Sequence, residues 1–130
     1  DREPGADAAT GRPAEPLYRR VAAHAARWHE RFGTVGLVVG ATAPSELAAV
    51  RAIAPALAFL VPGVGAQGGD LPTVLDHGPA VAGRAGAAGG GALLVNVSRG
   101  IAAAALGRDD AEAAVATAAQ EWSERLAVLR

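Results

Sequence analysis

The sequence predicts an α/β fold in which buried parallel strands alternate with helices. Three short apolar runs, over residues 35–40, 59–62 and 93–97, have the length and apolar character of buried strands. A helical pattern follows each run, and strands joined through helices lie parallel with right-handed crossovers. Hydrophobic residues make up 51% of the chain and charged residues 19%, against roughly 25% charged residues in ordinary domains. Most of the chain is therefore expected to fold.

The N-terminal part predicts an arm followed by a helix. Residues 1–15 are rich in Pro, Gly, Ala and Asp and predict a mobile arm or loop. A helical pattern starts at Pro16 and ends at Gly33, a plausible C-cap. Four residues at helical spacing predict the face that packs on the sheet, with the histidine as a core residue: Leu17, Val21, His24 and Trp28.

The middle of the chain predicts two strand–helix units. The run 35–40 predicts a strand buried on both faces. Thr42 can cap the next helix, with Pro44 in its first turn. After the second strand, at 59–62, Asp70 can cap a short third helix.

The last third predicts a loop, a strand and two helices. The low-complexity stretch from Ala82 to Ala92 predicts a flexible loop. The strand at 93–97 leads through Ser98-Arg99-Gly100 into a short Ala-rich helix. A last helix is expected to start near Asp109 or Asp110. Its apolar face contains Val115, Trp122, Leu126 and Leu129.

The three strands predict part of a larger sheet. Their apolar edges would lack partners in a stand-alone sheet, and a (β/α)₈ barrel typically needs ~250 residues. The chain has 130 residues and no Met, which predicts that residue 1 lies inside a longer product. Residues 16–130 are accordingly expected to form the C-terminal part of a single barrel domain.

Composition narrows the classes of function. A net charge of −1 indicates neither nucleic acid nor an anionic membrane as a partner. Without Cys, disulfides, thiolate nucleophiles and Cys-based zinc sites are excluded, which fits a cytoplasmic protein. No apolar run reaches the roughly 18 residues of a membrane span. His24, His29 and His77 lack a metal-like spacing, and the last two are expected to be solvated.

Two segments carry candidate chemistry, and each follows a predicted strand. In Pro62–Asp70, glycines permit positive φ and close approach of N–H groups to a ligand, and Gln67 can donate to a phosphate oxygen. The alternative is a plain strand-to-helix turn. In Asn96–Gly100, Arg99 lies at a helix start and offers a planar charged fork. The alternative is a surface Arg paired with a carboxylate. Because the last two strand–helix loops of barrels commonly form a phosphate site, the pair predicts one.

These segments resemble orotidine 5′-phosphate decarboxylases, specifically the bacterial type 2 subgroup. The run Pro62–Asp70 resembles the signature after that family's seventh strand. Val35–Thr42, followed by Pro44–Leu47, resembles the sixth strand and helix, and Leu94–Ile101 resembles the eighth strand with its phosphate-gripping Arg. The resemblance covers most of residues 16–107.

The resemblance implies a fold, a reaction and a set of contacts. The fold is a TIM (β/α)₈ barrel, of which this chain supplies about the last three strands and their helices. The reaction converts orotidine 5′-phosphate to UMP and carbon dioxide in pyrimidine synthesis, without metal or organic cofactor. Gln67 and Arg99 would contact the phosphate, with backbone N–H groups at Ser98 and Arg99; Pro62 and Val64 would line the pocket near the pyrimidine. Ser98 replaces a Gly found in much of the family and keeps the N–H.

The resemblance also implies what this chain lacks. The family's general acid is the lysine of an Asp-Lys-Asp array on strands two and three, and the partner subunit adds an Asp. Since the chain contains no Lys, it is expected to be inactive alone and to need the N-terminal half of the same barrel, the intact protein being a cytoplasmic homodimer. Two alternatives remain open: another phosphate-binding barrel enzyme of the epimerase or synthase type, or a non-catalytic half-barrel that assembles with itself or a complementary fragment.

Overall fold

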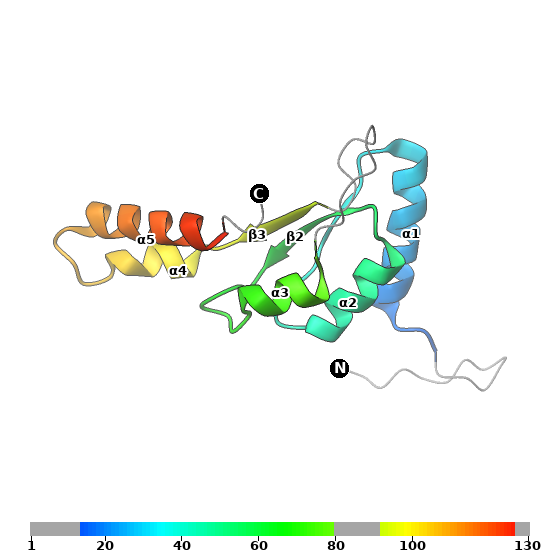
Figure 1. Cartoon of the computed structure of the whole chain (residues 1–130), viewed down its shortest axis with the longest axis horizontal. Helices are drawn as coiled ribbons and strands as arrows, with labels where there is room; N and C mark the ends of the chain where they lie inside the picture. The colour runs from blue at the N-terminus through cyan, green and yellow to red at the C-terminus, as the bar shows by residue number, and fades with distance from the viewer. Residues whose placement is uncertain (1–13, 80–91, 127–130) are drawn as a thin grey trace.

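The computed structural model describes residues 14–79 and 92–126 (Figure 1). Helices and strands alternate through these residues, which confirms the predicted α/β class. The elements are α1 (Leu17–Phe32), β1 (Gly36–Val38), α2 (Pro44–Ile53), β2 (Ala58–Pro62), α3 (Leu71–His77), β3 (Leu93–Asn96), α4 (Arg99–Ala102), the 3-10 helix η1 (Ala103–Ala105) and α5 (Ala111–Arg125). The predicted arm up to residue 13, the predicted loop up to residue 91, and Leu129 lie outside the described residues.

The three strands form one parallel sheet in the order β1-β2-β3. Consecutive strands are neighbours and each crossover contains a helix, as in one arc of a (β/α)₈ barrel. The register places Leu60 of β2 between Val38 of β1 and Leu94 of β3. The arrangement therefore fits part of a barrel, as predicted.

Only one face of this sheet is covered in the described part of the chain. Phe59 and Val61 are 1% and 0% exposed and join Leu47 and Val74, from α2 and α3, in one core. Side chains of the opposite face remain open: Val38 is 69%, Leu60 37% and Leu94 66% exposed. The expectation of strands buried on both faces is therefore wrong for these residues, because no described element covers the second face.

Helix α1 packs through its small residues. Ala22 and Ala25 are buried, which allows α1 to approach α2 and β1 closely. The predicted packing face is wrong, because Leu17, Val21 and Trp28 are 73%, 49% and 54% exposed. His24, predicted as a core residue, is exposed with them.

The end of α1 follows the sequence prediction at one residue and departs from it at another. Gly33 adopts φ 74° and its N–H donates to the His29 carbonyl at 2.7 Å, which confirms the C-cap. His29 was expected to be solvated, but it is half-buried. Its Nδ1 lies 3.2 Å from the carbonyl oxygen of Val35 and so ties the helix end to the chain before β1.

The helix starts differ in how they are capped. Asp70 caps α3 as predicted, since its carboxylate accepts from the Thr73 N–H at 3.3 Å and from the Thr73 hydroxyl. The predicted Thr42 cap of α2 is wrong by one position. The N-cap there is Ala43, which has no side chain to accept, and Pro44 occupies the first turn.

The C-terminal helices α4 and α5, with η1 between them, lie side by side at the end of the molecule away from α1 (Figure 1). Helix α5 begins directly after Asp110, as predicted. Its apolar face packs as expected, because Trp122 is 9% exposed and Val115 and Leu126 are half-buried. Trp122 is thus the principal anchor of α5.

Candidate functional site

The two predicted loops meet at the carboxyl ends of β2 and β3. Pro62, the last residue of β2, pairs in register with Asn96, the last residue of β3. Because the strands are parallel and adjacent, the segments that follow them leave the sheet side by side. This is the edge at which α/β enzymes place their ligands.

The loop after β2 is a tight turn held by its own backbone. Gly65 donates to the Gly69 carbonyl at 2.8 Å, Gly68 to Gly65 at 2.8 Å, and Gly69 to Gly63 at 3.0 Å. Gly63, Gly65 and Gly68 have φ of 100°, 83° and 91°, values that only glycine adopts without strain. The N–H groups of Gly65, Gly68 and Gly69 are used within the loop and are therefore not free for a ligand, and Gln67 brings the loop's polar side chain to the hollow.

The Gln67 amide lies over this turn. Its Oε1 is 3.5 Å from the position that a Cβ on Gly63 would occupy. At Gly69, by contrast, a Cβ would lie 2.5 Å from the Ala41 Cβ and 2.6 Å from the Gly63 carbonyl oxygen. Gly69 is therefore required by close packing against Ala41, in the segment that follows β1, and this packing fixes the loop that presents Gln67.

A small hollow of about 30 Å³ opens between the two loops. Its lining comes from both sides: Gly63, Val64, Ala66, Gln67, Asn96, Ser98 and Arg99. Four of the five predicted site residues are among them. The fifth, Pro62, is half-buried in β2 and does not line the hollow.

The size of the hollow fixes where a ligand could sit. A volume of 30 Å³ holds roughly one or two waters, which is less than a phosphate group. Val64 is buried at the floor, whereas Gln67, Ser98 and Arg99 are exposed at the rim. An anion would therefore lie at the mouth, within reach of the polar side chains, and the buried floor would stay apolar.

Asn96 is a lining residue that was not singled out from the sequence. Its Nδ2 donates to Ser98 Oγ at 3.3 Å, so it orients a hydroxyl at the rim. The available signal was its position, since a polar residue that ends a buried strand points to the edge where the loops meet.

Arg99 makes no ion pair with any carboxylate in residues 14–79 and 92–126, so the alternative of a surface ion pair finds no support there. Helix α4 has four residues, and a single turn sums few peptide dipoles. The guanidinium is therefore the main source of positive charge at the hollow, more than the helix start.

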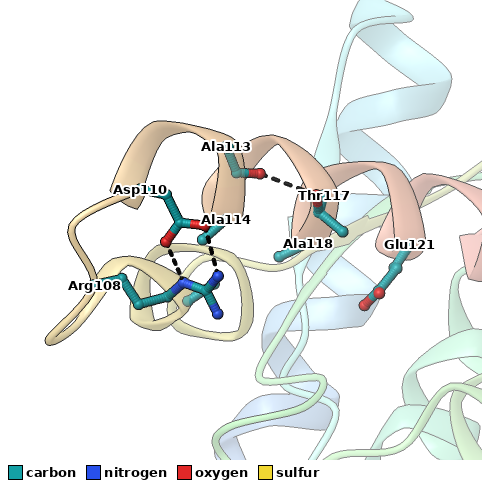
Figure 2. Close-up of a pocket in the computed structure, with 8 residues that line it drawn as sticks. Arg108, Asp110, Ala113, Ala114, Thr117, Ala118 and Glu121 are labelled. Atoms are coloured by element: carbon teal, nitrogen blue, oxygen red, sulfur yellow. Dashed lines mark hydrogen bonds and ion pairs between the residues drawn. The ribbon is translucent and has the colours of Figure 1, made fainter.

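A larger hollow of about 320 Å³ lies between η1 and α5 (Figure 2). Its one cation, Arg108, is bound by Asp110, with Nε–Oδ1 and Nη2–Oδ2 distances of 2.7 Å. These bonds lower the pKa of the Asp110 carboxyl and raise the pKa of Arg108. The rest of the lining is alanine, Thr117 and the carboxylate of Glu121, so this hollow has no unpaired cation to attract an anion.

Within the described ranges, no group of three His, Asp or Glu side chains is arranged to hold a metal ion. In the same part of the chain, every helix is too short or too polar to span a bilayer.

Comparison with known proteins finds sequences that are similar to this chain. No family model matches it. It is 53% identical over 114 residues to orotidine 5′-phosphate decarboxylase of Halorubrum lacusprofundi, covering 86% of this chain and 40% of that protein. The corresponding enzyme of Azoarcus sp. is 48% identical over 106 residues, covering 82% and 37%. The chain thus spans about two fifths of the curated relatives it matches.

Solved structures agree with the sequence matches. Leishmania donovani UMP synthase superposes with a TM-score of 0.54 at 48% identity, covering 85% of this chain and 23% of that one. Leishmania donovani OMP decarboxylase gives 0.51 at 45% identity, covering 78% and 34%. The resemblance inferred from the loop sequences is confirmed.

Proposed function

We propose that this chain, which is homologous to part of the orotidine 5′-phosphate decarboxylases, supplies the phosphate-binding segment of such an enzyme. The observation that carries the proposal is the meeting of Gln67 and Arg99, from adjoining strand ends, at one hollow. The substrate is orotidine 5′-phosphate, and the products are UMP and carbon dioxide.

The rim of the hollow suits a phosphate group. Arg99 offers a permanent charge and a planar pair of donors, Gln67 an amide donor and Ser98 a hydroxyl. Hydrogen bonds to a charged group contribute about 1.5–3 kcal/mol each. Because the phosphate is not part of the reacting centre, its binding energy can be used to stabilise the transition state. Val64 at the floor, with Pro62 behind it, would lie toward the pyrimidine.

The uncovered sheet face supports the second part of the proposal, that an N-terminal half of the same barrel completes this domain. Val38, Leu60 and Leu94 lie in one row across the sheet and are exposed. Burying an aliphatic side chain of this kind contributes about 1.5–3 kcal/mol. In a closed barrel this row faces the interior, where layers of such side chains pack.

A groove beside β1 points the same way. It has a volume of about 630 Å³ and runs between α1 and β1, lined by Leu17, Tyr18, Val21 and Val39 among others. Within the described residues β1 forms one edge of the sheet, and its Leu37 and Val38 also line this groove. A preceding barrel strand would pair with that edge and fill the groove. The lysine-bearing array, absent from a chain without Lys, belongs to this half, so that residues 16–130 form the C-terminal part of one domain. A cytoplasmic homodimer is the assembled form that we propose.

The test is a chimera in which this chain replaces the matched segment of the Azoarcus enzyme, which is 48% identical. We expect the chimera to convert orotidine 5′-phosphate to UMP, and Arg99→Ala in it to raise KM. A folded chimera with no decarboxylation would contradict the proposal. Conversion that Arg99→Ala and Gln67→Ala leave unchanged would contradict the assigned phosphate site.

A further inference from the structure

We propose that Trp122 of α5 is a positioning residue that sets the distance between the Gln67 loop and the start of α4, which carries Arg99. This inference rests on the proposed function, because it concerns the two loops of the phosphate site. Trp122 does not line the hollow, and so it acts through the loops and not on the ligand.

The indole ring touches both loops at their glycines. A Cβ on Gly65 would lie 3.1 Å from Cζ2 and 3.2 Å from Cη2 of Trp122. A Cβ on Gly100 would lie 3.1 Å from Nε1 and 3.2 Å from Cζ2 of the same ring. One ring atom, Cζ2, therefore occupies the space beside both glycines, and the ring acts as a spacer between the two segments.

The presence of glycine at position 100 supports this role. Gly65 has φ 83° and needs glycine for its backbone alone, whereas Gly100 is not among the residues with positive φ. Glycine in a helix is less favourable than alanine. Contact with Trp122 accounts for a glycine there, since a methyl group would crowd the ring and Val97 Cγ1, which is at 3.2 Å.

The spacer is itself held firmly. Trp122 is 9% exposed, and the Arg125 guanidinium stacks on its ring with Cζ 4.0 Å from the centroid. A site that binds one anion through the Gln67 loop and the start of α4 depends on the distance between these two segments. A displacement of about 1 Å in a binding group can lower catalysis by about 100-fold. The buried ring fixes that separation from behind the site.

The experiment compares Trp122→Leu with Trp28→Leu in the barrel completed by the N-terminal half proposed above, by amide hydrogen exchange and by binding of UMP and uridine. Trp28 is the matched control because it is 54% exposed on α1 and far along the chain from both loops. In Trp122→Leu we expect the loop amides of Gly65, Gly68 and Gly69, and those of Ile101 and Ala102, to exchange about tenfold faster or more. The amides of Leu47 and Ala54 should keep their rates. UMP affinity should fall about tenfold or more, and uridine affinity should not change.

Other results overturn the inference in distinguishable ways. Loop amides that keep their rates would remove the positioning role. Faster exchange throughout the protein, or an equal loss of UMP and uridine binding, would reduce Trp122 to a general packing residue. If the wild-type protein binds UMP no better than uridine while the loops still loosen in Trp122→Leu, the phosphate assignment fails and the spacing role stands. If Trp122→Leu does not fold, Trp122→Phe serves as the test variant. Phe keeps an aromatic ring in the core but has no atom at the position of Cζ2. We expect it to show a smaller loss of UMP affinity, about threefold.

Discussion

The two sides of the candidate site are built on regions that differ in how they are held. The Gln67 side follows β2, and the largest fully buried side chains of the described residues lie in this strand and in its core: Phe59, Leu47, Leu57, Val61 and Val74. The Arg99 side grows from α4, which has no buried residue and leads to α5, where only Trp122 is buried. The site thus joins a packed scaffold to a helical pair with one large anchor. Changes on the first side should act on stability, and changes on the second on binding.

The largest expected effect is on the packed side. Phe59→Ala removes a ring that is 1% exposed, and such truncations cost about 3–5 kcal/mol through lost burial and the cavity left behind. Urea unfolding of the barrel completed by the proposed N-terminal half measures this change in the free energy of unfolding. Leu106→Ala, at a side chain that is 79% exposed, is the control and should stay within about 0.5 kcal/mol of wild type. Equal losses from both variants would show that the packed region is not the stabilising core.

A second change separates close packing from backbone strain within the loop. At Gly69 a methyl group would lie 2.5 Å from the Ala41 Cβ, whereas at Gly68 nothing lies within 4 Å and only the positive φ opposes a side chain. Gly69→Ala should destabilise the protein by about 1–3 kcal/mol through overpacking and weaken UMP binding. Gly68→Ala should cost about 1–2 kcal/mol from φ alone. Thermal unfolding and UMP titration of both variants give the comparison, and a Gly68→Ala loss of binding as large as that of Gly69→Ala would remove the role assigned to the Ala41 contact.

On the other side, Arg99→Ala should affect binding without affecting stability. Arg99 is exposed and pairs with no carboxylate of the described residues. Its removal should weaken UMP binding by about 1.5 kcal/mol or more, close to tenfold, while uridine binding and the unfolding midpoint stay unchanged. The loss should shrink as salt is added, because screening weakens the attraction between charges. Arg27→Ala, at an exposed position on α1, is the matched control for removal of a positive charge.

The sequence alone supports the local features better than the environment of each element. The Gly33 and Asp70 caps and the start of α5 depend on residues close in the chain, and these predictions are confirmed. The parallel strands follow from the alternation of strands and helices and are confirmed as well. The packing face of α1 was not, because spacing identifies an apolar stripe but not which neighbour covers it. The strands read as buried on both faces for the same reason. Continuous apolar runs report the environment of a complete barrel, whereas the described residues cover only one face.

The site could be predicted to a similar depth. Strand order brings Gln67 and Arg99 to the same edge, and this follows from the alternation of strands and helices alone. The bonds inside the glycine loop could not be found in this way, because they depend on φ values that strand order does not fix. The contact of Trp122 with Gly65 and Gly100 could not be found either, because it joins residues distant in the chain. Asn96 is an intermediate case. Its position at the end of a strand can be predicted from the sequence, whereas its hydrogen bond to Ser98 cannot.

The smallest expected effect tests whether the hollow between η1 and α5 is separate from the site. The bonds from Arg108 lower the pKa of Asp110, so Arg108→Gln should raise that pKa toward its ordinary value, as followed by carboxyl NMR titration. A carboxyl whose folded pKa is depressed contributes stability above its unfolded pKa and loses that contribution as the pH falls through the folded pKa. Wild type and variant should therefore differ little in stability in acid, with any advantage of the wild type appearing toward neutral pH and remaining small because the pair is exposed.

UMP affinity should not change in Arg108→Gln, since Arg108 is already paired and lines a different hollow. If Arg108→Gln lowered UMP affinity as much as Arg99→Ala does, phosphate binding would depend on the positive charge of Arg108, between η1 and α5.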